Sequence, residues 1–136
     1  MVEDREEDRF LLALLLRRLG LTNTILQLPD GEQAIHYLSA EGIHAERRSF
    51  PLPSVLFLDL RMPRKSGFTV LEWLRANPLP NPVLVFVVSD SLSRGDIQRA
   101  YQLGASSFIS KPLNEAEIRE CIRSHPQFWE FEDPSL

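Results

Sequence analysis

"VLFLDLRMPRKSGF", residues 55–68, is the stretch on which the expected fold depends. It opens with a continuously apolar run, which is typical of a strand covered on both faces of a sheet. A single aspartate, Asp59, stands at the end of this run, and the proline and glycine that follow it indicate a turn. The stretch therefore predicts a buried strand with one carboxylate at its exit.

Alternating strand and helix signals surround this stretch. Apolar runs predict further strands over residues 24–28, 83–88 and 107–110. Helical spacing of apolar residues occurs over 6–19, 32–40, 68–77, 96–103 and from Asn114 onward, and a long loop is expected over 41–53. Strands that are separated by helices pair in parallel through right-handed crossovers. The pattern predicts an α/β fold, a three-layer sandwich around a parallel sheet.

Composition excludes several classes of function. The 136 residues suffice for one domain, and 43% hydrophobic with 25% charged residues is usual for a globular protein. A net charge of -4 offers no general attraction to phosphate backbones, so nucleic acid is not an expected partner. The longest apolar stretch, residues 10–16, is much shorter than the ~20 residues of a membrane span. We therefore expect a cytoplasmic protein that does not enter a membrane.

Three polar residues lie at the carboxyl ends of the expected strands, where ligands bind in such sheets. Asp59 ends one strand, Ser89 ends the next, and Lys111 follows the last. The acidic pair Glu3 and Asp4 precedes the first helix and is expected at the same edge. Crowded carboxylates repel one another, and a hard divalent cation such as Mg²⁺ removes this repulsion with oxygen ligands. In-line attack on a phosphoryl group needs mainly positioning and charge neutralisation, so Asp59 is the candidate nucleophile.

These residues resemble the response regulator receiver family, in particular the stand-alone regulators that serve phytochrome-type sensor kinases. The resemblance rests on "FLDLRMPRKSGF", "VFVVSDS" and "GASSFISKP", and on the spacings of Ser89 and Lys111 from Asp59. It predicts a receiver domain over residues 1–125, with a flavodoxin-like fold. The aromatic and acidic residues 126–136 are expected to form a tail outside the domain.

The resemblance also implies a function. The chain would accept a phosphoryl group from a sensor histidine kinase in a two-component phosphorelay and signal through changed partner binding. It would not be an enzyme beyond Mg²⁺-dependent autophosphorylation and autodephosphorylation. The implied catalytic residues are Asp59 as phosphoacceptor, Lys111 and Ser89, and Ser89 with Phe108 forms the implied switch pair. The metal would be held by Glu3, Asp4, Asp59 and the backbone carbonyl of Arg61.

One feature departs from the family pattern, in which a longer apolar strand leads into the acidic pair. Here only Met1 and Val2 precede Glu3, so the first strand is expected to be shortened or missing. Unpaired strand edges are costly, and two remedies are open: residues 24–28 slide to pair with 55–60, or a second chain covers the edge. Association is favoured because it also uses the apolar helix over 10–19, so a homodimer or larger assembly is expected.

Structural roles remain as alternatives for the site residues. An aspartate at a strand end often caps the following turn, and Glu3 and Asp4 suit the acidic start of a helix. In these alternatives Ser89 is a structural hydroxyl, Lys111 is a solvated turn residue and Phe108 is a core aromatic. The alternative function is a receiver-like interaction or dimerisation module that works without phosphorylation.

Overall fold

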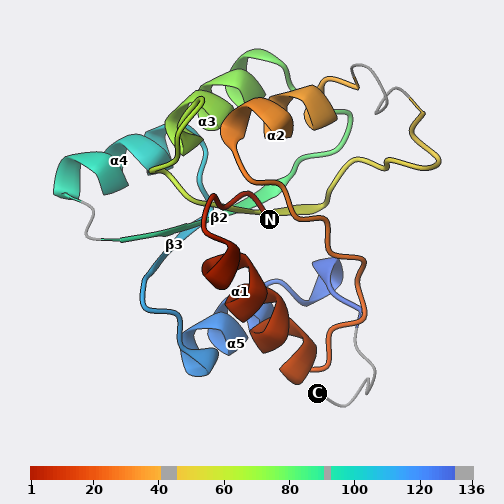
Figure 1. Ribbon diagram of the computed structural model, residues 1–136, viewed down its shortest axis with the longest axis vertical. Coiled ribbons are helices and arrows are strands. Elements are labelled where there is room, and N and C mark those ends of the chain that lie inside the picture. The colour runs from red at the N-terminus through yellow and green to blue at the C-terminus, as the bar shows by residue number, and fades with distance from the viewer. Residues whose placement is uncertain (41–45, 91–92, 131–136) are drawn as a thin grey trace.

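A computed structural model describes residues 1–40, 46–90 and 93–130 of the chain (Figure 1). Its sheet contains β1 (Val55–Leu58), β2 (Leu84–Ser89) and β3 (Ser107–Ser110), paired in parallel in the order β1-β2-β3. The helices are α1 (Glu6–Arg18), α2 (Gly31–Leu38), α3 (Gly67–Ala76), α4 (Arg94–Gln102) and α5 (Glu115–Arg123). In Figure 1, α2 and α3 lie above the sheet and α1 and α5 below it. The predicted α/β three-layer sandwich is confirmed.

Each face of the sheet builds its own core, because successive strand residues point to opposite sides. Leu56, Leu58, Val85 and Val87 pack with residues of α2 and α3. Phe57, Phe86, Val88 and Ile109 pack instead with residues of α1 and α5. Burial on both faces explains why β1 and β2 appear in the sequence as continuous apolar runs.

Side-chain caps set the starts of four helices. The N-cap residues Asp30, Ser66, Ser93 and Asn114 each accept a hydrogen bond from the backbone N–H three positions further on. Such a cap satisfies a donor that the first helical turn leaves free. The helix bounds differ from the expected ones by only a few residues, as α1 shows by ending at Arg18, just before Gly20.

The first three residues lie beside β1, between it and Leu28, in the second place from one edge of the sheet. Val2 is buried and forms single parallel bridges to Leu28 on one side and to Leu58 on the other. Its N–H donates to the carbonyl of Phe57 at 2.8 Å, and its carbonyl accepts from Asp59 N–H at 3.0 Å. The predicted first strand is therefore shortened to a bridge, and this bridge brings Glu3 beside Asp59.

The predicted strand over residues 24–28 is wrong, and one of the two remedies left open for the short first strand is contradicted. Residues 24–28 form no extended strand, and only Leu28 makes a bridge. The segment also does not slide to pair with residues 55–60, because Val2 lies between them. The contacts with residues 1–3 are few: the Leu28 N–H donates to the Met1 carbonyl at 2.9 Å, and the Met1 amine donates to the Leu26 carbonyl at 2.6 Å.

Part of the expected tail packs onto the domain. After a 3₁₀ turn over Pro126–Phe128, the Trp129 ring stacks on Phe86 with ring centroids 6.3 Å apart and lies near Phe57. Thr22 N–H donates to the carbonyl of Glu130 at 2.8 Å. Residues 131–136 of the tail and 41–45 of the expected loop lie outside the described residues. Within the described part of the chain, every helix is too short or too polar to span a membrane.

Candidate functional site

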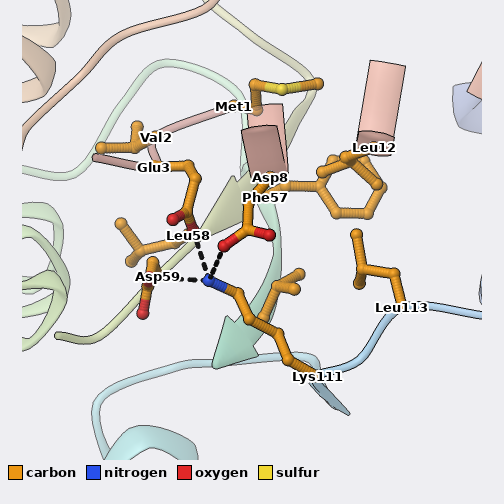
Figure 2. A pocket seen from close by; sticks show the side chains of 11 residues that line it. Met1, Val2, Glu3, Asp8, Leu12, Phe57, Leu58, Asp59, Lys111 and Leu113 are labelled. Atoms are coloured by element: carbon orange, nitrogen blue, oxygen red, sulfur yellow. Dashed lines mark hydrogen bonds and ion pairs between the residues drawn. The ribbon is translucent and has the colours of Figure 1, made fainter. Parts of the chain in front are cut away.

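The structure brings Asp59, Ser89 and Lys111 together at the carboxyl edge of the sheet. Figure 2 shows the contact between Asp59 and Lys111. Asp59 follows β1, Ser89 is the last residue of β2, and Lys111 follows β3. Asp59 and Ser89 are both buried. Parallel strands end at one edge, and this is why residues far apart in sequence meet here.

Hydrogen bonds fix both oxygens of the Asp59 carboxylate. Oδ1 accepts from the Ser89 hydroxyl at 2.8 Å and from the Arg61 backbone N–H at 3.0 Å. Oδ2 accepts from the Lys111 ammonium group at 3.1 Å. The turn after Asp59 is held by Gly67, because a Cβ atom there would lie 2.2 Å from the Asp59 carbonyl oxygen. Only glycine allows the start of α3 to approach so closely.

Lys111 is shared by three carboxylates. Its Nζ lies 2.9 Å from Glu3 Oε2, 3.0 Å from Asp8 Oδ2 and 3.1 Å from Asp59 Oδ2. Figure 2 shows the three contacts converging on this nitrogen, with Asp8 reaching it from α1. Asp8 is the site residue that the sequence interpretation missed. The signal is the run of acids from Glu3 to Asp8, of which only Glu3 and Asp4 are assigned to the site from the sequence.

The pKa values of the two buried carboxyl groups, those of Glu3 and Asp59, shift in opposite directions. Burial raises the pKa of Glu3 to about 8, and contact with Asp59 adds to the rise against the opposing effect of Lys111. Burial alone would also raise the pKa of Asp59, but it is lowered by hydrogen bonds from Glu3, Arg61 N–H and Ser89 and by the charge of Lys111. Lys111 keeps its proton, since its carboxylate partners raise its pKa despite burial. Asp59 is therefore the ionised member of the pair.

The acidic residues at this edge fit a divalent cation. Glu3, Asp4 and Asp59 each offer a carboxylate oxygen, and these oxygens lie within 4.8 Å of one another. An all-oxygen set of this kind suits Mg²⁺. The Arg61 N–H binds Asp59, which places the backbone of Arg61 next to the same carboxylate. Its carbonyl as a further ligand stays a prediction.

Phe108 lies on β3, next to the strand that carries Ser89. It is opposite Val87 in the sheet, while Ser110, two residues further on, is opposite Ser89. The Phe108 side chain is partly buried against the core on the α2 and α3 side of the sheet. Phe108 is thus a partly buried aromatic residue on the strand next to the one that ends at Ser89.

Comparisons with known proteins agree with this geometry. Residues 1–123 match the profile of the response regulator receiver domain, and these residues include β1 to β3, α1 to α5 and every site residue named above. The response regulator Rcp1 of Synechocystis sp. (strain ATCC 27184 / PCC 6803 / Kazusa) is 27% identical over 129 residues. That match covers 95% of this chain and 86% of Rcp1.

Solved structures give the same result. The bacteriophytochrome response regulator AtBRR has a TM-score of 0.80 at 28% identity, covering 97% of this chain and 94% of that one. The Mn²⁺-bound form of Rcp1 has a TM-score of 0.76 at 26% identity, with 93% and 89% covered. The phosphorylated cyanobacterial phytochrome response regulator RcpA has a TM-score of 0.74 at 27% identity, with 97% and 95% covered.

Proposed function

The chain belongs to the response regulator receiver family and has its flavodoxin-like fold, and from this premise we propose that Asp59 accepts a phosphoryl group from a sensor histidine kinase. The observation that carries the proposal is the Asp59 carboxylate itself. It is buried, and it is contacted by a hydroxyl on one oxygen and by an ammonium group on the other. The modified surface then binds a partner, which completes a two-component phosphorelay step.

The transfer uses groups that are already in place. A carboxylate oxygen of Asp59 forms the new P–O bond while the bond from phosphorus to the kinase histidine breaks, and its electron pair stays on the histidine nitrogen, which takes up a proton. Lys111 moves from Asp59 to an oxygen of the phosphoryl group, and the Ser89 hydroxyl donates to another. Fixed donors of this kind stabilise charge on the transferring group.

We propose that Mg²⁺ is held by Asp4, Asp59 and the Arg61 carbonyl, with Glu3 contributing through water. When bound, the ion neutralises the carboxylates and the incoming phosphoryl oxygens. The oxygen cluster of Glu3, Asp4 and Asp59 supports this assignment, as does the Mn²⁺ in the structure of the similar protein Rcp1. The chemistry of the chain is then limited to phosphoryl acceptance and loss, with Mg²⁺-dependent autophosphorylation and autodephosphorylation.

The kinase partner that fits best is a phytochrome-type histidine kinase. This proposal is supported by the similarity to AtBRR and RcpA, which are both phytochrome response regulators. Output is proposed to pass from the phosphoryl group to Ser89 and then to Phe108. A hydroxyl that moves to a new acceptor frees space that a neighbouring ring can fill, which gives a packed two-state element.

Intact mass measurement after incubation with acetyl phosphate tests the proposal. Wild-type protein is expected to gain one phosphoryl group with Mg²⁺ and none with a chelator, and Asp59→Asn is expected to gain none. Asp90→Asn is the matched control, because Asp90 is exposed and follows Ser89 directly. The rival function, a receiver-like module that works without phosphorylation, requires an unchanged wild-type mass under all conditions.

A further inference from the structure

The outer face of α1 carries a symmetric pattern of side chains. Its exposed residues are Glu6, Glu7, Phe10, Leu14, Arg17 and Arg18. Steps of three and four residues place them in one stripe along the helix. Phe10 is 68% exposed and Leu14 is 43% exposed, and because they are four residues apart they are neighbours on the helix surface.

When the residue order of the helix is reversed about residue 12, each acidic position of the stripe falls on a basic position, and each apolar position falls on an apolar one. Glu6 exchanges position with Arg18, Glu7 exchanges with Arg17, and Phe10 exchanges with Leu14. Two such helices packed antiparallel therefore place acids against bases at both ends and apolar side chains against each other in the middle. A twofold interface requires this kind of self-complementary surface.

We propose that two copies of this chain associate through the outer faces of α1, packed antiparallel about a twofold axis near Leu12. Phe10 of each copy packs against Leu14 of the other, and this apolar contact supplies most of the stabilisation. The charged ends fix the antiparallel orientation, since like charges would meet in the parallel arrangement. The proposal names a second copy as the occupant and does not depend on phosphorylation of Asp59.

Contacts inside the chain leave this face available. Leu12, Leu15 and Leu16 on the opposite side of α1 pack into the core against α5, so the fold does not use the outer stripe. Arg17 donates one guanidinium N–H to the Leu21 carbonyl and keeps other donors. Arg18 lies 3.8 Å from Glu115 with its side chain 62% exposed, a weak surface pair that a partner can replace.

Two charge-reversal variants test the proposal. Glu6→Arg with Glu7→Arg gives a stripe with bases at both ends, and Arg17→Glu with Arg18→Glu gives acids at both ends. Each variant alone places like charges together in the dimer and is expected to weaken association about tenfold or more. An equal mixture of the two is expected to form heterodimers at wild-type strength, because every end then meets its opposite.

Sedimentation velocity between about 1 µM and about 500 µM measures the association, since a single helix pair buries less than a standard interface. Far-ultraviolet circular dichroism checks that each variant is folded. The control is Glu32→Arg with Glu120→Arg, at exposed sites on α2 and α5. It makes the same charge change as Glu6→Arg with Glu7→Arg and is expected to associate like wild type. Phe10→Ser with Leu14→Ser, which leaves the charged ends in place, is expected to abolish association.

A wild-type protein that stays monomeric at the highest concentration would overturn the proposal and leave the face to solvent or another protein. Association that survives in both charge variants and in the serine variant would also overturn it, since the interface would then lie elsewhere. Failure of the mixture to associate better than either variant alone would rule out the antiparallel pairing. None of these outcomes bears on whether Asp59 is phosphorylated.

Discussion

The carboxyl edge of the sheet and the outer face of α1 are built from the same kinds of residue under opposite conditions. At the sheet edge, Glu3 and Asp59 are buried and both contact Lys111 inside the chain. On α1, Glu6, Glu7 and the two arginines are exposed. Buried charges depend strongly on their partners, whereas exposed pairs contribute little. The sheet edge is therefore suited to chemistry, and the exposed charges of α1 are suited to orienting a second helix against it.

Helix α1 contributes to both regions. Asp8 turns inward to the Lys111 ammonium group at 3.0 Å, while Glu7, its neighbour in the same turn, is exposed. The difference between these two acids follows from the helix period, which points adjacent residues to different sides. Substitutions of an inward-facing residue, each compared with an exposed residue of similar chemistry, therefore distinguish the effects of the two regions.

Removing the buried cation is expected to have the largest effect. Lys111→Met leaves the carboxylates of Glu3, Asp8 and Asp59 without their shared partner, and we expect a loss of about 3 kcal/mol in the free energy of unfolding. The labelling rate should fall about a hundredfold, as for loss of one donor to a developing charge. Lys65→Met, at an exposed lysine, should change neither quantity. Equal behaviour of the two variants in urea unfolding and mass labelling would contradict the assigned role of Lys111.

Stability without metal is expected to fall as the pH rises from about 5 to 8. Glu3 has an ordinary pKa of 4.5 and a pKa of about 8 in the fold, so between these values the folded protein binds a proton that the unfolded chain does not. The unfolding free energy then decreases with pH by at most about 1.4 kcal/mol per unit. Urea unfolding in a chelator measures this slope, and Glu3→Gln should flatten it. A slope that is the same in both proteins would be evidence against the raised pKa.

Ser89→Ala is expected to have a moderate effect on stability and a specific effect on signalling. The loss of the hydrogen bond to Asp59 should cost about 1.5 kcal/mol, because the acceptor is charged. The final extent of labelling should remain largely intact, while the phosphorylation-linked change in hydrogen exchange of α4 and α5 should be lost. Ser93→Ala, which removes only a helix cap, is the control. If labelled wild type and labelled Ser89→Ala change equally, the switch does not run through Ser89.

Asp8→Asn is expected to have the smallest effect, and it should raise the labelling rate where Lys111→Met lowers it. Asp8 competes with the incoming phosphoryl group for Lys111, so its removal should raise the labelling rate a few-fold, about 0.5 to 1 kcal/mol in the barrier. Glu7→Gln, one residue away on the exposed side, should leave labelling unchanged and weaken association instead. A slower Asp8→Asn would show that Asp8 positions Lys111 for the transfer.

The fold was predictable where a local pattern decides the structure. The apolar runs of β1, β2 and β3 predicted those strands closely. The segment 24–28 has an equally good strand pattern but forms only the Leu28 bridge, because a strand also needs a partner of sufficient length. The shortened first strand and its place between the segments ending at Leu28 and Leu60 could be expected from the sequence, whereas its reduction to the bridges of Val2 required the structure.

The site was predictable in the part that follows from strand ends. Asp59, Ser89 and Lys111 come together because parallel strands end at one edge. Asp8 was not predictable in the same way, since its role depends on how α1 packs against the sheet. The symmetric stripe of α1 was present in the sequence, but only burial showed which residues of the helix are exposed.

The most direct test of the account is to locate the phosphoryl group on the labelled chain. Four carboxylates lie around Lys111 or in the proposed metal site, namely those of Glu3, Asp4, Asp8 and Asp59. We would label the protein with acetyl phosphate and Mg²⁺, reduce the acyl phosphate with borohydride, and map the modified residue by tandem mass spectrometry. We expect the modification at Asp59 alone, because it is the ionised carboxylate that both Ser89 and Lys111 contact. Modification at Glu3, Asp4 or Asp8, or at none of the four, would contradict the account.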